Sequence, residues 1–437
     1  MRQDDAEQQR SRRPGYRSVL GDRSFQALSL ASFVSVAGDQ IARVALSVLV
    51  YERTASAALT GLTYAMSYLP SVIGGPLLSG FADRRPRRAV MIACDLVRAV
   101  LVLLMAVPWI PLPLLLVLLA LVTLAEAPFD AARGAMMPDV LPGDRYPIGG
   151  AISQVVLQAA MVAGFAVGGA LLLVATPREL LALDALTFLV SAVLVRVVPH
   201  GLVATAQDPD DVPSRPLDDL RVASRVVFRS PTLRPLVLLA WCMSAAAIAP
   251  EALAAPYADA LGAGSSAVGV LLAAGPVGNV LAGLVLARVP EARRLVLMWP
   301  LATLASAPLV LCLLHPPLSV VVLLVGLSGM GTAFHLVAMV RFVTLVEPAK
   351  RGRALGLAGT GLAVGQGLAV ALAGVLGDLL DPAVAVAIAG IAGVVAAMVW
   401  GPSLHRPVAG VAPAAGHDGL VERVIDPGAE PNPAAVA

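Results

Sequence analysis

The sequence predicts an all-α polytopic membrane protein, with twelve transmembrane helices arranged as two six-helix halves. The first observation behind this prediction is composition: 58% of the residues are apolar and 14% are charged, and the mean hydropathy is +0.82. Soluble domains have about 45–50% apolar and about 25% charged residues. The second observation is the length of the apolar runs, and the third is the position of the arginines between them. All three argue against a soluble multidomain enzyme.

Twelve apolar runs are long enough to cross a bilayer, because a spanning helix needs about 20 mostly apolar residues. The runs are too long for the strands of a membrane β-barrel, and they lack the alternating polarity of such strands. The predicted spans cover residues 25–51, 58–81, 88–108, 112–131, 148–175, 179–198, 234–256, 265–287, 295–314, 317–341, 353–377 and 382–400.

The basic residues lie between these runs and alternate to one side. Most of the 31 Lys and Arg residues lie in the N-terminal arm, the turn at 84–88, the central loop, the tail, or short loops on the same side. The positive-inside rule places this side in the cytoplasm. We therefore expect both termini in the cytoplasm and a multi-pass protein of the cell's inner (cytoplasmic) membrane.

The longest polar interruption divides the chain into six spans plus six. Short motifs recur in the second half at one common offset, as in Arg23-Ser24 and Arg229-Ser230. Tandem halves related by an axis along the membrane normal produce such a pattern. The predicted parts are a cytoplasmic arm (1–24), a first six-helix half (25–198), a central loop (199–233), a second six-helix half (234–400) and a disordered tail (401–437).

Composition also argues against several classes of partner and cofactor. A net charge of +2 gives no reason to expect nucleic acid. Cys94, Cys242 and Cys312 lie in predicted spans without the spacing of metal ligands, so neither a disulfide nor a metal site is expected. No Gly-x-x-x-x-Gly-Lys-Ser/Thr loop occurs, which argues against ATP as the energy source, and no other cofactor is expected. The five histidines are too few and too scattered to suggest a membrane-embedded enzyme.

A short basic turn joins the second and third spans, with the sequence SGFADRRPRR from Ser79 to Arg88. Its charged positions include Asp83, Arg84, Arg87 and Arg88. The turn resembles the signature of the major facilitator superfamily, although Ser79 and Pro86 stand where that signature has glycines. The resemblance implies a twelve-helix transporter in which these charges latch a gate against neighbouring helices. Arginines that only fix the topology are the alternative.

Four further motifs resemble a branch of this superfamily that contains enterobactin-type and macrolide-type exporters. They are Gly38-Asp39 in span 1, residues 93–98 in span 3, residues 137–142 after span 4 and residues 183–188 in span 6.

Span 5 is similar to the antiporter motif of the superfamily, although Phe165 replaces its proline. The small residues that carry this likeness are Gly164, Gly168 and Gly169. Small residues four apart also permit close helix packing. An antiport-specific role and a packing role are therefore both open.

Asp39 is the leading candidate for proton coupling. It lies near the middle of span 1, where an ionised side chain costs about 2.5–3.5 kcal/mol. Arg43 lies four residues further on the same helix face, so the two can pair. In the functional hypothesis Asp39 exchanges protons and Arg43 changes partner between two states of a transporter; a static ion pair is the alternative. Glu126 in span 4 is a second candidate proton carrier, with a structural charge cluster as the alternative.

Other charged residues in the spans have more local interpretations. Asp95 and Arg98 lie one to two turns inside span 3, and we expect them to extend the charge network of the basic turn. Asp184 and Glu251 are expected in the outer portions of spans 6 and 7, within reach of interfacial water.

Several polar and aromatic side chains are candidates for an amphipathic cavity, with helix packing as the alternative. They are Tyr64 and Tyr68 on one face of span 2, Gln154 and Gln158 on one face of span 5, and Phe334, His335 and Gln366 in the second half.

The resemblance implies a secondary active transporter that works by alternating access. We expect proton-coupled export of an amphipathic small molecule, such as a drug, a siderophore or a secondary metabolite. Its partners would be that molecule, protons and the lipid bilayer, and a monomer is expected. A nutrient uniporter or symporter, and a non-transporting membrane scaffold or sensor, are the alternatives.

Overall fold

The computed structural model describes residues 16–72, 74, 85–198 and 216–405. Every regular element within these ranges is helical, which confirms the predicted all-α class. The predicted latch residues Asp83 and Arg84, with Ser79, lie outside the described residues, as do residues 1–15, 199–215 and 406–437.

The first half begins with a short helix and continues with long ones. α3 is capped by Asp22, whose carboxylate accepts hydrogen bonds from the backbone N–H groups of Ser24 and Phe25. α9 begins with a reciprocal capping box of Thr176 and Glu179. The helices are α2 (Tyr16–Leu20), α3 (Arg23–Thr54), α4 (Ala57–Ala65), α6 (Arg87–Met105), α7 (Leu112–Val140), α8 (Arg145–Leu171) and α9 (Pro177–Val195).

The second half follows an amphipathic helix, α10, in the central loop. Its spans are more often divided than those of the first half. The helices are α10 (Pro216–Arg229), α11 (Leu233–Ala247), α12 (Ala249–Ala252), α13 (Ala254–Ala260), α14 (Ser266–Ala287), α15 (Glu291–Leu304), α16 (Ala307–Val310), η1 (Leu311–Leu314), α17 (Leu318–Thr332), α18 (Phe334–Leu345), η2 (Pro348–Lys350), α19 (Arg351–Leu379), α20 (Pro382–Trp400) and η3 (Gly401–His405).

The helices of spans 7 and 10 are each interrupted within the apolar run. Span 7 breaks at Ile248, and Pro250 lies in the first turn of α12, where a missing N–H costs no helical bond. Span 10 breaks at Ala333, between α17 and α18. Non-helical backbone at membrane depth is tolerated where it is buried in protein or lines a cavity. Both breaks lie beside the central cavity described below.

Nine helices in the described part of the chain are long and apolar enough to cross a membrane, and each coincides with a predicted span. Predicted span 2 begins as α4 and runs into residues outside the described ranges. Predicted spans 3 and 6 are α6 and α9, each 19 residues long and richer in charge. Their outward side chains are still apolar, as lipid contact requires: Val100, Leu103, Leu186 and Val193. The total of twelve spans stays a prediction.

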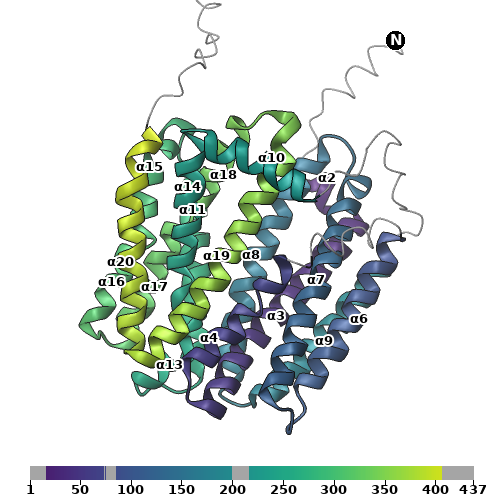
Figure 1. Cartoon of the computed structure of the whole chain (residues 1–437). Helices are drawn as coiled ribbons and strands as arrows, with labels where there is room; N and C mark the ends of the chain where they lie inside the picture. The colour runs from purple at the N-terminus through teal and green to yellow at the C-terminus, as the bar shows by residue number, and fades with distance from the viewer. Residues whose placement is uncertain (1–15, 73, 75–84, 199–215, 406–437) are drawn as a thin grey trace, which may run out of the picture. The chain divides into compact units, whose positions relative to one another are not determined.

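The two halves share one apolar core cluster, while the other three clusters each belong to a single half. The shared cluster contains Val48 and Phe165 of the first half with Leu253, Leu272 and Val370 of the second. Across this boundary α4 packs against α19, and α8 packs against α14 (Figure 1). Apolar burial between the halves is therefore concentrated around these helix pairs.

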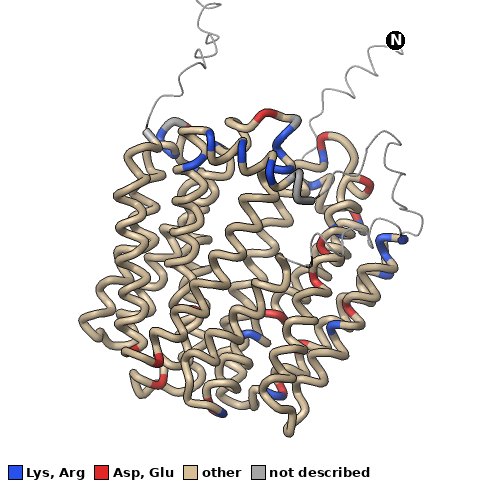
Figure 2. The backbone as a smooth tube through the Cα atoms, in the orientation of Figure 1, with Lys and Arg blue, Asp and Glu red and all other residues tan. Residues whose placement is uncertain are grey.

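Basic residues gather at one end of the helices (Figure 2), the end at which α8 and α19 begin. We call the opposite end, at which α4 begins and α19 ends, the arginine-poor end. Its few basic residues include Arg53 and Arg178, which donate to backbone carbonyl groups of the loop before α7. This distribution follows the pattern from which the sidedness was predicted.

Polar contacts join the halves at the arginine-poor end. Asp378 of α19 accepts hydrogen bonds from the Ser56 hydroxyl at 2.6 Å, from the backbone N–H of Ala58 at 3.1 Å and from the backbone N–H of Ala57. The second half thus supplies an acid to the N-terminus of a first-half helix, where unsatisfied N–H groups favour negative charge. The Tyr51 hydroxyl also donates to Asp259, at 3.2 Å.

Close backbone contact accompanies these bonds. A side-chain carbon added to Gly374 would lie 2.6 Å from the Ala57 carbonyl oxygen and 3.0 Å from the Cα atom of Gly61. Only glycine permits helices to approach this closely.

Candidate functional site

An ion pair between two helices occupies the interior of the first half. Arg98 of α6 donates from Nη2 to both carboxylate oxygens of Asp39 of α3, at 2.8 and 2.9 Å. The Arg98 side chain is 2% exposed. Its guanidinium carbon lies 4.2 Å from the ring centroid of Phe188, where the aromatic face attracts a cation.

Arg43 makes different contacts from those its spacing suggested. Its Nη1 atom donates to the Tyr68 hydroxyl at 3.4 Å, and its guanidinium lies 5.4 Å from the Tyr68 ring centroid. The expected pairing of Asp39 with Arg43 is therefore wrong, and Arg98 is the partner of Asp39. Spacing on one helix identifies residues on the same face, but a carboxylate can instead meet a guanidinium from a neighbouring helix.

Three further acids act electrostatically on Arg98: Asp95, Glu126 and Asp184. Asp95 is fully buried, and its carboxyl group faces the Ser191 hydroxyl of α9. Asp184 is 1% exposed and accepts a hydrogen bond from the Thr187 hydroxyl at 3.1 Å. The expectation that Asp184 reaches interfacial water is therefore wrong. Arg98 lies in the interior, where it meets Asp39 of α3, and α6 also packs against α9. A link from Asp95 and Arg98 to the basic turn stays a prediction, because Asp83 and Arg84 lie outside the described residues.

A cavity of about 30 Å³ lies among these charges, large enough to hold water. Its lining includes Asp39, Arg43, Arg98, Glu126 and Asp184. Charged side chains at membrane depth are costly and mark functional positions by default. We call Asp39, Arg43, Asp95, Arg98, Glu126 and Asp184 the charge cluster.

The described part of the basic turn contacts helices of its own half. Arg87 pairs with Asp139 and donates to the Ala135 carbonyl oxygen at 2.6 Å, both on α7. Arg88 donates to the carbonyl oxygen of Val198, just beyond α9, at 2.9 Å. These bonds tie α6 to α7 and α9; the gating role of the turn stays a prediction.

The glycines of the antiporter-like motif lie at helix contacts. A side-chain carbon on Gly164 would lie 2.4 Å from the Ala37 carbonyl oxygen of α3. Gly168 packs against the same helix, and Gly169 packs against Gly269 of α14 in the second half. Their packing role is visible, and an antiport-specific role stays a prediction.

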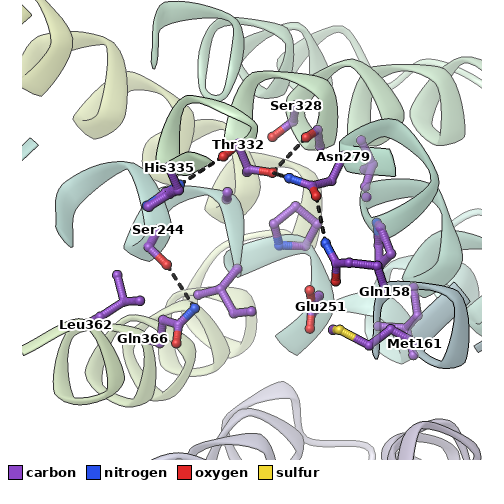
Figure 3. A pocket seen from close by; sticks show the side chains of 18 of the residues that line it. Gln158, Met161, Ser244, Glu251, Asn279, Ser328, Thr332, His335, Leu362 and Gln366 are labelled. Atoms are coloured by element: carbon purple, nitrogen blue, oxygen red, sulfur yellow. Dashed lines mark hydrogen bonds between the residues drawn. The ribbon is translucent and has the colours of Figure 1, made fainter. Parts of the chain in front are cut away.

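A central cavity of about 430 Å³ lies between the halves (Figure 3). Four of the seven predicted cavity residues line it: Gln154, Gln158, His335 and Gln366. The other three lie elsewhere. Tyr64 and Phe334 are buried in apolar core clusters, and Tyr68 contacts Arg43. Ligand cavities typically measure about 300–1,000 Å³, so this one has the size of a small-molecule site.

A chain of hydrogen bonds crosses the cavity from one half to the other (Figure 3). Gln158 of α8 donates to Asn279 Oδ1 of α14 at 2.7 Å, and Asn279 Nδ2 donates to the Thr332 hydroxyl at 2.8 Å. His335 lies beyond this chain, with Nδ1 at 3.0 Å from the Thr332 carbonyl oxygen and Nε2 at 3.1 Å from the Ala240 carbonyl oxygen. On the other wall, Gln366 donates to the Ser244 hydroxyl at 2.8 Å.

Sequence reasoning missed the place of Glu251 in the cavity wall. We expected it near interfacial water, but it lines the central cavity. One signal was available, because Glu251 is the only acidic residue within the predicted spans of the second half. Asn279, Thr332 and Ser244 also line the cavity, and polar residues inside apolar runs were the corresponding signal.

No group of three or more His, Cys, Asp or Glu side chains is placed to hold a metal ion within the residues that the structure describes. The three cysteines are free.

The sequence is similar to one curated protein, the uncharacterized MFS-type transporter YvqJ of Bacillus subtilis (strain 168). The two are 26% identical over 275 residues, which make up 61% of this chain and 65% of that protein. The similarity thus spans somewhat less than two thirds of the relative's length.

Solved structures share the fold. The nucleoside transporter NupG aligns with 88% of this chain and 100% of its own, with a TM-score of 0.67 and 16% identity. The peptide transporter POT, in complex with sulfate, aligns with 90% of this chain and 96% of its own, with a TM-score of 0.69 and 14% identity. At these identities the likeness concerns the fold alone.

A sequence profile of the Major Facilitator Superfamily matches residues 28–311 and 252–428. These matches extend over both halves and the central cavity between them, and the chain belongs to the Major Facilitator Superfamily.

Proposed function

We propose that this membrane transporter exports an amphipathic small molecule through the central cavity in exchange for protons. The cavity lies between two halves that can rock against each other, which is the arrangement that alternating access requires. Its lining combines amide and hydroxyl groups with apolar side chains such as Ile248 and Leu272, which suits an amphipathic substrate.

The observation that carries proton coupling is the imbalance within the charge cluster. Four carboxyl groups act on Arg98, and one of them, Glu126, also acts on Arg43. With the neighbouring Asp130 and Arg133 included, five carboxyl groups accompany three guanidinium groups. An uncompensated buried charge is costly, so protons or other cations are needed to neutralise the excess carboxyl groups. Asp39 is the candidate that both lines the small cavity and holds Arg98, and Glu126 lines the same cavity.

Export is the direction that the branch resemblance suggests. The fold also serves proteins described as nucleoside and peptide transporters. Uptake of a nutrient by uniport or symport is therefore the second candidate function, and the hydrogen-bonding groups of the cavity suit a polar nutrient as well.

Inverted membrane vesicles test the proposal. The vesicles carry a pH-sensitive dye and an acid-inside gradient, and cationic, neutral and siderophore-like compounds are added in turn. We expect at least one compound to trigger proton release with the wild type and none to do so with Asp39→Asn. Glu291→Gln removes an exposed carboxylate outside the charge cluster and serves as the control.

Each result has a distinct meaning. Release that survives Asp39→Asn would move proton coupling to Glu126 or Asp95. Compound uptake by right-side-out cells together with the absence of release would favour the nutrient carrier. Absence of both would argue for a member of the family that does not transport these compounds.

A further inference from the structure

A second, apolar pocket adjoins the central cavity within the second half. This pocket measures about 290 Å³ and lies between α11, α18 and α19. His335 and Leu362 line both spaces, so the pocket lies directly beside the central cavity. The remaining lining is apolar and includes Trp241, Ala338 and Phe342.

The two spaces differ in chemistry. The central cavity contains one ionisable acid, Glu251, and no Lys or Arg lines it. The Glu251 carboxylate has no hydrogen-bond or ion-pair partner among the described residues, and it points into the cavity (Figure 3). A carboxylate in such a position is stabilised by a cation that enters the cavity.

Arg43 is the basic residue that acts on the Glu251 carboxylate, but its guanidinium group contacts Tyr68. Arg43 acts on Glu251 from the first half, but its guanidinium donates to Tyr68 and lies over the Tyr68 ring. Arg43 lines the small cavity of the charge cluster rather than the central cavity. Glu251 therefore keeps an open site on its cavity side.

We propose that the cavity binds an amphipathic monocation, with its charged group at Glu251 and its apolar body in the pocket beside Trp241. This inference names the substrate class of the transport site and therefore rests on the proposed function. Size supports it, because a ligand that fills both spaces has the dimensions of a typical drug-like molecule. The shared position of His335 and Leu362 places the boundary between the polar and apolar parts of the ligand.

Binding to the purified full-length protein tests this proposal without requiring transport. The probe is radiolabelled tetraphenylphosphonium, a compact monocation with an apolar surface, at mildly alkaline pH. Tetraphenylborate has almost the same size and the opposite charge, so it serves as the competitor. We expect the cation to bind and the borate anion to leave its binding unchanged.

Two variants separate the parts of the site. Glu251→Gln should weaken binding of the phosphonium by roughly tenfold to a hundredfold, the range for a lost interaction with a charged group. Gly359→Leu should weaken it by roughly tenfold, because Gly359 lines the apolar pocket and a side chain added there meets open space.

Matched controls exist for both variants. Glu291→Gln removes an exposed acid outside the cavity. Gly356→Leu adds the same side chain one helical turn earlier on α19, also into open space, and Gly356 does not line either space. Both controls should bind the phosphonium as the wild type does, and melting curves in detergent check that all variants fold.

Three results would overturn the proposal: no binding of the phosphonium to the wild type, equal binding by Glu251→Gln, or displacement by tetraphenylborate. Failure here and failure of the proposed function are distinguishable. Proton release by neutral compounds without phosphonium binding would remove the cation site and keep the antiporter. Binding that depends on Glu251 without proton release would keep the site and remove proton antiport.

Discussion

The contact between Asp378 and the N-terminus of α4 predicts a measurable shift in the opening of the arginine-poor end. Asp378 accepts three hydrogen bonds from residues of the other half. These bonds must break if the halves separate at this end. Asp378→Asn removes the negative charge and one acceptor oxygen while keeping the size of the side chain.

The magnitude follows from helix capping. Loss of an N-cap acceptor costs about 0.5–2 kcal/mol, and loss of a negative charge at a helix N-terminus costs about 0.3–1 kcal/mol. The amide of Asn keeps one acceptor, and Asp378 is exposed, so water screens its charge. We therefore expect a change of about 1 kcal/mol, which favours the open arginine-poor end by roughly fivefold.

Distance measurements between spin labels test this expectation. Glu52 and Gly264 are exposed residues of the two halves at this end, and cysteines introduced there in a cysteine-free background accept the labels. Asp381→Asn is the matched control, because Asp381 caps α20 within its own half, accepting from the Ala383 N–H at 2.8 Å. A larger population of long distances is expected only for Asp378→Asn. An unchanged distribution, or the same shift in both variants, would refute the reasoning.

Two further predictions concern stability and closure. Arg98→Met should destabilise the protein by about 3–5 kcal/mol, the cost of leaving a buried charge without its partner. Arg43→Met should cost clearly less, because Arg43 donates its hydrogen bond to the neutral Tyr68 hydroxyl, at 3.4 Å, and not to a carboxylate. Denaturation in detergent compares the two, and equal losses would contradict the assigned partner of Asp39. Gly374→Ala should prevent full closure of the arginine-poor end, because the added carbon meets the backbone of α4. Gly365→Ala should not, because a carbon added there meets open space. The same spin-label distances report both variants, and unaltered distances in Gly374→Ala would count against the close contact.

Hydropathy was enough to locate nine spans within the described residues, because the bilayer imposes one length and one polarity on each of them. It could not reveal the breaks at Ile248 and Ala333, since the backbone interrupts its helix there within a continuous apolar run. It also identified α6 and α9 although both carry interior charges, Asp95 and Arg98 on α6 and Asp184 on α9.

The partners of the buried charges were harder to predict. Spacing on one helix suggested Arg43 for Asp39, but the residue that meets Asp39 is 59 positions away on α6. Pairings between helices depend on packing, which a single sequence does not display. The cavity shows the same limit. Gln158 and His335 were expected to line it, and they do. Glu251 was expected near the membrane surface, because the sequence does not reveal the helix break three residues before it.

The bond between Gln158 and Asn279 has a consequence for the protein without its substrate. Both groups are amides, so each can exchange its partner for water or for a polar group of a ligand at little net cost. When no ligand group binds these amides, Gln158 of α8 stays hydrogen-bonded to Asn279, which in turn bonds Thr332. These bonds link the two halves and resist their separation. A bound molecule that satisfies either amide removes this resistance. Occupancy would then speed the conformational exchange, and the empty carrier would return more slowly. If transport is coupled to protons as proposed, the slow return would also limit proton leakage without substrate.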